Sequence, residues 1–217
     1  MRKPKPSLDH SRAVAYLAER DPILKQLMTR CGPCLLKQAK GGFETVAEII
    51  VGQQLSTIVA TRIFQRLRTL AGGRFTPAKA LKLTDAQYRS VGLSRAKTLY
   101  VRDLASKVID GEVSFRRMDK MSDGEVTEML IRVKGIGPWT AQMYLMFVLG
   151  RPDIFSAGDK GIQTAMAKLY RKRNVKKLDR FAERWKPYRS VACWYLWRSL
   201  NNTPPATTAE AARYTQG

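Results

Sequence analysis

A glycine-containing turn, Gly135-Ile136-Gly137, followed at once by Pro138, is the segment with the clearest potential for chemistry. Glycine tolerates positive φ and leaves backbone N–H groups uncovered, and proline is favoured at the first position of a helix. Uncovered N–H groups at a helix N-terminus bind phosphate oxygens. The segment therefore predicts either a phosphate-binding hairpin or an ordinary tight corner between two helices, with Ile136 turned back into the helix pair.

The three cysteines, Cys31, Cys34 and Cys193, favour neither a disulfide framework nor a metal site. An odd cysteine count argues for a reducing compartment. Cys31 and Cys34 have the spacing of a redox motif, but that motif follows a strand, whereas the segment before Cys31 has helical periodicity. A structural zinc site or an iron–sulfur cluster needs four ligands, and the chain has one histidine besides these cysteines.

The charge balance indicates a polyanionic partner. The chain holds 39 Lys and Arg against 18 Asp and Glu, a formal net charge of +21. Such a chain favours nucleic acid, and less readily an anionic membrane. No stretch reaches the roughly 20 apolar residues that span a bilayer, and no basic amphipathic helix stands out. The basic N-terminus lacks the apolar core of a secretory signal, so we expect neither membrane association nor secretion.

The elements that must position the turn are predicted to be helices. Apolar residues recur at helical spacing, and no alternating run is long enough to demand a strand. Helix-start signals occur at Asp21-Pro22, Thr76-Pro77, Thr84 with Gln87, and Ser122 with Glu125. Longer helices are predicted over about 94–110, 138–150, 159–171 and 188–200. The prediction is an all-α fold over 9–200, with the hairpin at 133–141 and flexible ends at 1–8 and 201–217.

The order of several motifs gives the chain a family resemblance. The hairpin is followed by one helix and then by a loop running from Asp153 to Gln163. In this the chain resembles the helix-hairpin-helix DNA glycosylases, in which a Gly/Pro-rich loop and a catalytic Asp follow the hairpin. Within them it resembles the 3-methyladenine DNA glycosylase II branch. The resemblance covers about 43–200 and includes Val51-Gly52-Gln53-Gln54-Leu55-Ser56, Val91-Gly92-Leu93-Ser94 and Arg184-Trp185-Lys186-Pro187-Tyr188-Arg189-Ser190.

The resemblance implies two helical subdomains with an active-site cleft between them and places the catalytic carboxylate at Asp159. Breaking an N-glycosidic bond builds positive charge on the deoxyribose, which a facing carboxylate stabilises while it orients or deprotonates the attacking water. Asp159 is also suited to cap the helix that follows it, and the two roles are compatible. Asp153, earlier in the loop, is interpreted as structural.

Residue 139 determines the expected reaction type. Bifunctional members of the family carry a lysine two residues after the second hairpin glycine, where this chain has Trp139. Lys134 and Lys160 are nearby but match no such position. We therefore expect a monofunctional hydrolase that leaves an abasic site and has no strand-cleaving lyase activity.

The resemblance also assigns a base pocket. Trp139 and Trp197 match its aromatic residues, and an aromatic face attracts the cationic base formed by alkylation at purine N3 or N7. Where the branch often has a tyrosine four residues after the first Trp, this chain has Met143, with Tyr144 beside it. Either tryptophan is alternatively a core residue.

The resemblance implies DNA contacts from the hairpin and from a turn between two helices, which in the family supplies the side chain that enters the duplex. Gln54, with Leu55 beside it, is the first choice for the side chain that fills the gap left by a flipped base; the alternative is a cap before Ser56. The set of expected contacts is Gln53, Gln54, Leu55, Ser56, Lys134, Gly135, Ile136, Gly137 and Thr140. Later basic residues face phosphates or only solvent: Lys168, Arg171, Lys172, Arg173, Lys176 and Lys177.

The predicted function is excision of alkylated purines, of the 3-methyladenine and 7-methylguanine type, from double-stranded DNA in base excision repair. The alternative is a helix-hairpin-helix module that holds DNA without catalysis. We expect a monomer without a metal, an iron–sulfur cluster or another cofactor, although the hairpin at 133–138 is a candidate site for a monovalent cation. The expected location is the cytoplasm and nucleoid of a prokaryote or the nucleus of a eukaryote.

Overall fold

A computed structural model describes residues 10–200, and within this range every regular element is a helix. The predicted all-α class is thereby confirmed. The flexible ends predicted at 1–8 and 201–217 lie outside the described residues.

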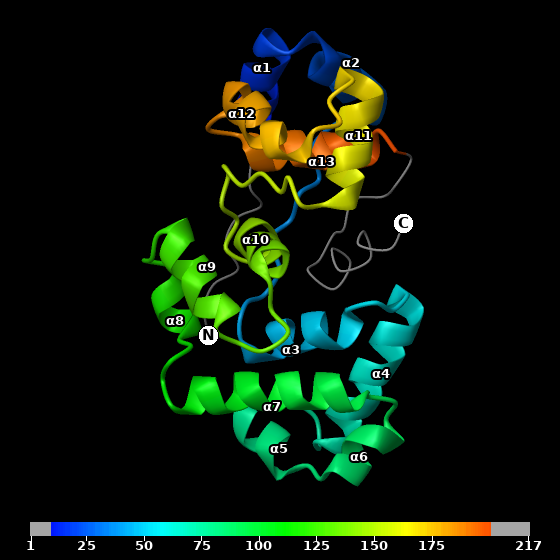
Figure 1. The fold of residues 1–217 in the computed structure, drawn as a ribbon, viewed down its shortest axis with the longest axis vertical. Coiled ribbons are helices and arrows are strands. Elements are labelled where there is room, and N and C mark those ends of the chain that lie inside the picture. Colours follow the sequence, from blue (N-terminus) through cyan, green and yellow to red (C-terminus); the bar gives the residue numbers. More distant parts are fainter. Residues whose placement is uncertain (1–9, 201–217) are drawn as a thin grey trace.

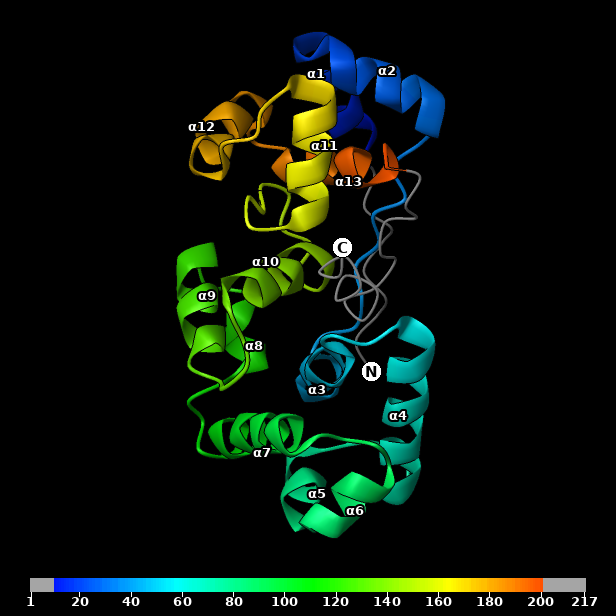
Figure 2. The same ribbon diagram turned by 45° about the vertical axis from the view of Figure 1, so that its right-hand side comes forward.

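The helices form two groups stacked along the long axis, with α10 between them (Figures 1 and 2). One group contains α3 (Phe43–Gly52), α4 (Thr57–Leu70), α5 (Pro77–Lys82), α6 (Asp85–Ser90), α7 (Arg95–Ile109), α8 (Phe115–Met118) and α9 (Asp123–Ile131). The other combines α1 (Ser11–Arg20) and α2 (Pro22–Cys31) with α11 (Lys160–Tyr170), η1 (Val175–Lys177), α12 (Leu178–Ala182), η2 (Glu183–Trp185) and α13 (Arg189–Arg198).

Helix α10 (Pro138–Phe147) is apolar on almost every side, which is why it lies between the groups. Its residues from Met143 to Phe147 are all buried. The hairpin enters α10 at one end, and the loop to α11 leaves from the other. The position of α10 therefore determines how hairpin and loop are arranged around it.

Several helix boundaries follow the sequence signals. The capping boxes at Thr84 with Gln87 and at Ser122 with Glu125 are both present, and Asp21 accepts hydrogen bonds from two N–H groups at the start of α2. Two predicted helices are shorter than expected. Helix α10 ends at Phe147 because the chain turns through Gly150 at φ 66°, and α13 covers Arg189–Arg198 rather than 188–200.

Candidate active site

The glycine turn forms a hairpin between α9 and α10, and its two glycines differ. Gly135 has φ 79°, and a Cβ atom there would overlap the Tyr100 ring, so only glycine fits. A Cβ at Gly137 would meet nothing within 4 Å, which leaves this end of the hairpin open. Ile136 is buried, as expected for a residue turned back into the helix pair. Lys134 is exposed, while its backbone N–H donates to Asp103 Oδ2 at 2.8 Å.

Asp159 lies at the N-cap of α11, where it is only 1% exposed. Its Oδ1 accepts from the N–H of Ile162 at 2.8 Å and from Trp197 Nε1 at 2.9 Å. Its Oδ2 accepts from Trp139 Nε1 at 2.9 Å. A buried carboxylate requires such donors, and two of the three come from indoles on different helices. The structure thus brings together Asp159, Trp139 and Trp197, which are far apart in sequence.

The aromatic side chains beside Asp159 form a layer along α10. Trp139 is half-buried, and Met143 and Phe147 follow at intervals of four residues, which places all three on one face of the helix. Trp197 stacks on Phe147 with ring centroids 5.9 Å apart and is itself 1% exposed. Phe147 belongs to this layer although sequence reasoning missed it; its helical spacing from Trp139 was the available signal.

Two predicted site residues of α10, Tyr144 and Thr140, have buried side chains. Tyr144 packs against Phe115 and directs its hydroxyl toward the Gly41–Gly42 segment, so its described contacts do not involve Asp159. Thr140 is 5% exposed in the first turn of α10, so a contact with DNA at this position would come from its backbone. The roles of Tyr144 and Thr140 remain predictions.

The segment between α3 and α4 is a tight turn with Gln54 at its tip. Gln53 has φ −54° and ψ 131°, Gln54 has φ 57°, and the Leu55 N–H donates to the Gly52 carbonyl at 3.1 Å. These values describe a type II turn, whose third residue is usually glycine because its φ is positive. A non-glycine residue in this conformation stores about 1–2 kcal/mol of strain. Gln54 is exposed, whereas Leu55 packs against the core.

The basic residues of the last third lie at the far end of α11. Lys168 lies in the last turn of α11, whose N-cap is Asp159. The others follow the end of this helix: Arg171, Lys172, Arg173, Lys176 and Lys177. The eleven residues of α11 span roughly 16 Å, which separates the C-terminal end of the helix from the Asp159 carboxylate at its start. Asp153 also has a structural place, because it accepts from Arg189 Nε at 2.8 Å and Nη2 at 3.0 Å at the start of α13.

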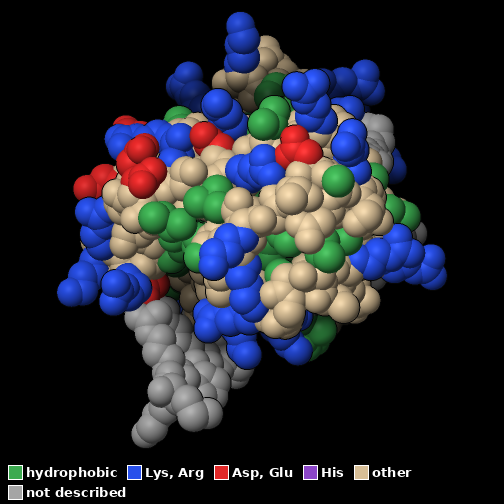
Figure 3. All heavy atoms as spheres, turned by 90° about the horizontal axis from the view of Figure 1, so that it is seen from below, with side chains coloured by type: hydrophobic (Ala, Val, Ile, Leu, Met, Phe, Trp, Pro, Cys, Tyr) green, Lys and Arg blue, Asp and Glu red, His purple; other side chains and the backbone are tan. Residues whose placement is uncertain are grey.

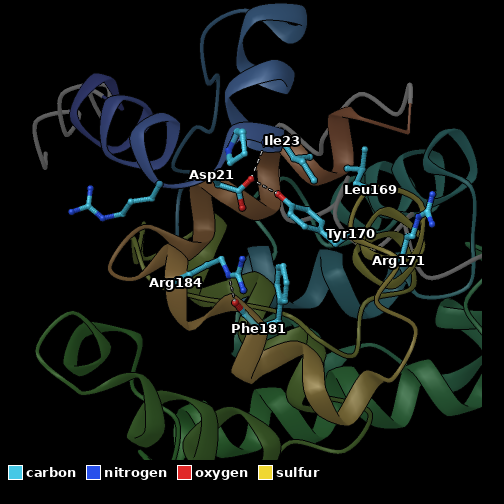
Figure 4. Close-up of a pocket in the computed structure, with 9 residues that line it drawn as sticks. Asp21, Ile23, Leu169, Tyr170, Arg171, Phe181 and Arg184 are labelled. Carbon is cyan, nitrogen blue, oxygen red and sulfur yellow. Dashed lines mark hydrogen bonds between the residues drawn. The ribbon is translucent and has the colours of Figure 1, made fainter.

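A second buried carboxylate, Asp21, resembles Asp159 in its partners. It accepts from Trp185 Nε1 at 2.8 Å, from the Tyr170 hydroxyl at 3.0 Å and from the N-terminus of α2. Figure 4 shows it beside a hollow of about 320 Å³ that Arg171, Phe181 and Arg184 also line. Burial and the neighbouring Asp21 raise the pKa of Tyr170, which keeps the phenol a hydrogen-bond donor. Asp21 therefore joins helices from both ends of the chain.

The environment of Cys34 and Cys193 disfavours a redox role for these two thiols. All three are free thiols, and burial raises the pKa of Cys34 and of Cys193 to about 12. A redox cysteine needs an accessible thiolate, which a thiol of this kind does not supply at neutral pH. Over residues 10–200, no group of three or more His, Cys, Asp or Glu side chains is arranged to hold a metal ion, and no helix could cross a membrane.

Comparison with known proteins identifies the family. The model of the HhH-GPD superfamily of base excision DNA repair proteins matches residues 46–189, and the chain belongs to this superfamily. An alkylbase DNA glycosidase-like protein of Schizosaccharomyces pombe is 28% identical over 88% of this chain and 93% of its own length. The DNA-3-methyladenine glycosylase of Saccharomyces cerevisiae is 33% identical over 77% of this chain and 70% of its own.

Solved structures agree with this placement. The DNA-3-methyladenine glycosidase of Bacillus halodurans superposes with a TM-score of 0.80 at 32% identity and covers 96% of each chain. The 3-methyladenine DNA glycosylase of Schizosaccharomyces pombe, solved with abasic DNA, gives 0.78 at 28% identity over 88% of this chain and 97% of that one. The predicted resemblance to helix-hairpin-helix glycosylases is confirmed.

Proposed function

We propose that the chain is a monofunctional DNA glycosylase that hydrolyses the N-glycosidic bond of alkylated purines flipped out of double-stranded DNA. The observation that carries the proposal is the placement of Asp159, a buried carboxylate held by two indole N–H groups beside the hairpin. The names of the relatives support the alkylated substrate class. The proposed enzyme acts as a monomer without a cofactor; a monovalent cation at 133–138 is compatible with the same chemistry.

The chemistry follows from the charge that develops during bond cleavage. As the base leaves, positive charge grows on the deoxyribose, and the Asp159 carboxylate stabilises it and positions the attacking water. An alkylated purine already carries positive charge and leaves without a general acid. The tight burial of Asp159 strengthens its electrostatic effect because water is excluded.

Access to Asp159 requires Trp139 to move. Asp159 is 1% exposed, and the Trp139 indole N–H occupies Oδ2, so sugar and water reach this oxygen only when the indole withdraws. In the proposed complex the flipped nucleotide displaces that hydrogen bond, and the Trp139 ring then faces the cationic base, an attraction of about 1–2 kcal/mol when desolvated.

The test compares two substitutions of the same kind, Asp159→Asn and Asp21→Asn. Asp159→Asn removes the charge while keeping the size, so base release from a duplex with 7-methylguanine should fall by about 100-fold or more, with DNA binding retained. Asp21→Asn weakens a buried network and should lower Tm, yet release measured well below that Tm should stay near wild type.

The outcomes separate the candidate functions. Near wild-type release by Asp159→Asn would remove the catalytic assignment. If the wild-type protein released no alkylated purine at all while still binding duplex, the chain would be a non-catalytic helix-hairpin-helix module.

A further inference from the structure

We propose that one edge of α7, formed by Lys97, Tyr100 and Asp103, is a positioning element that fixes the Gln54 turn relative to the hairpin. Its role in base flipping rests on the proposed function. The three residues recur every three positions, which keeps them along one edge of the helix. One end of that edge contacts the turn and the other end contacts the hairpin.

Lys97 fixes the backbone of the Gln54 turn through two hydrogen bonds. Its Nζ donates to the carbonyls of Val51, at 2.7 Å, and of Gln53. These carbonyls belong to the C-terminal end of α3 and lack helical partners. Both carbonyls precede Gln54 in the sequence, so the Lys97 ammonium fixes the backbone immediately before the strained residue. A strained φ such as that of Gln54 persists only when its surroundings enforce it.

Tyr100 and Asp103 hold the hairpin at the other end. The Tyr100 ring lies against Gly135 so closely that no side chain fits there. Asp103 Oδ2 accepts from the Lys134 N–H at 2.8 Å, and its Oδ1 is held by Lys107 Nζ at 3.0 Å. The hairpin is therefore located by a ring contact and a hydrogen bond from neighbouring turns of α7.

A third connection joins the turn to the hairpin directly. Gln53 Nε2 donates to the Gly135 carbonyl at 2.7 Å. The Gln54 turn, the hairpin and α7 thus contact one another in pairs. None of the three can move relative to the other two without breaking one of these hydrogen bonds. In the proposed complex this arrangement sets the offset between a phosphate bound at the hairpin and the Gln54 side chain inserted into the duplex.

Lys97 differs from an ordinary lysine at a helix end. Desolvation by burial lowers its pKa, and in the described part of the chain its hydrogen-bond acceptors are backbone carbonyls. Lys79 offers the matched comparison, because its Nζ also donates to a carbonyl near a helix C-terminus, that of Gly72 at 3.1 Å. Lys79 lies on α5, where it contacts neither turn nor hairpin.

The experiment compares Lys97→Met with Lys79→Met, each of which keeps most of the aliphatic stem and removes the ammonium. Release of 7-methylguanine is measured from two duplexes. In one the lesion is fully paired; in the other it lies opposite an abasic site, where it has no pairing partner and is already poorly stacked. Binding to a duplex with a tetrahydrofuran abasic site and to an undamaged duplex is measured alongside, as is Tm.

Lys97→Met should reduce release from the paired duplex by about 10-fold to 100-fold, because a small misplacement of a positioning group has this effect. Release from the duplex in which the lesion lies opposite an abasic site should fall far less than release from the paired duplex. The preference for the abasic duplex over the undamaged one should also drop, while Lys79→Met keeps wild-type values throughout.

An equal loss on both lesion substrates would overturn the proposal and leave Lys97 as a stabiliser of α3, as would an unchanged preference for the abasic duplex. Failure of the proposed function is distinguishable. If wild-type protein releases no base, the abasic preference of the two variants still tests the positioning role.

Discussion

The side chain at position 139 determines which nucleophile can reach the sugar. The strand-cleaving relatives that the chain resembles use an amine here, which attacks the sugar carbon and forms an imine. Trp139 instead donates its indole N–H to Asp159, and an indole nitrogen is not a nucleophile. In the proposed mechanism, water is therefore the attacker.

We accordingly expect incubation with a lesion duplex to leave intact strands that break only after hot alkali. Borohydride should trap no covalent complex. A stable trapped adduct would instead identify an amine, with Lys134 and Lys160 the first to be replaced, and would contradict the monofunctional mechanism.

The two hairpin glycines are expected to respond differently to alanine. Gly137→Ala places a methyl group in open space, so Tm should hardly change. If a phosphate approaches this backbone, affinity for duplex of any sequence should fall by roughly tenfold, the effect of losing one hydrogen bond to a charged group.

Gly135→Ala supplies the contrast. Its methyl group would overlap the Tyr100 ring at a positive φ, so Tm should fall before any DNA is added. Unchanged DNA affinity of Gly137→Ala, measured by titration, would place the phosphate elsewhere.

At the scale of single elements, α3 combines apolar packing with an unfavourable carboxylate. Burial, and next the charge of Glu44 one turn earlier, raise the pKa of Glu48, against the opposing effect of Arg68. Between the unfolded value of 4.5 and the raised folded value, the folded state binds more protons. Stability is therefore lost as pH rises through this window.

Glu48→Gln removes this penalty. The variant should be more stable than wild type at pH 7, by on the order of 1 °C in Tm after solvent screening, and the difference should vanish below pH 4.5. Glu19→Gln, on an exposed side chain, controls for the change in net charge. A gain that persists at low pH would indicate a packing effect instead.

Local signals predicted the helices, whereas the site depended on contacts that no local signal contains. Caps and prolines marked α2, α5, α6 and α9 because these interactions span only a few residues. Helices α1 and α12 carry no comparable signal and were not predicted. The motif order indicated Asp159 and Trp139, but not that Trp197 donates to the same carboxylate from 38 residues away.

The same limit explains which contacts around the site cannot be predicted from the sequence. Lys97 and Asp103 act on backbone groups that only the folded chain brings near α7. Tyr144 follows Met143 directly, and 100° of helix rotation per residue places it on a different part of the α10 surface, where it packs against Phe115.

For the molecule as a whole, positive charge dominates the surface. Figure 3 shows Lys and Arg side chains scattered across the face seen from below and around its edges, among uncharged atoms, with most of the visible Asp and Glu toward one edge. With a net charge of +21, affinity for undamaged duplex should fall steeply with salt, with a log–log slope of about −0.9 per neutralised phosphate.

Two variants test which lysines contribute to this slope. Lys134→Gln, at the hairpin, should make the slope shallower by about 0.9, and Lys176→Gln, beyond the far end of α11, should leave it unchanged. Equal changes in both variants would show that the charge acts only as a diffuse field.

Two hydrogen bonds join the ends of α2 to η2 and α13, which lie far from it in the sequence, and they bear on the order in which the described fold forms. Trp185 reaches back 164 residues to Asp21, and Tyr195 reaches 163 residues to the Gly32 carbonyl. Contacts of such long separation form slowly and only after the intervening chain exists. The hairpin and the Gln54 turn depend on α7, which lies between them in the chain, so on a ribosome they can form early. The indole of Trp197 is synthesised after all of these segments, and it donates to Asp159. We therefore expect the set of donors around the Asp159 carboxylate to be completed after the hairpin and the Gln54 turn have formed.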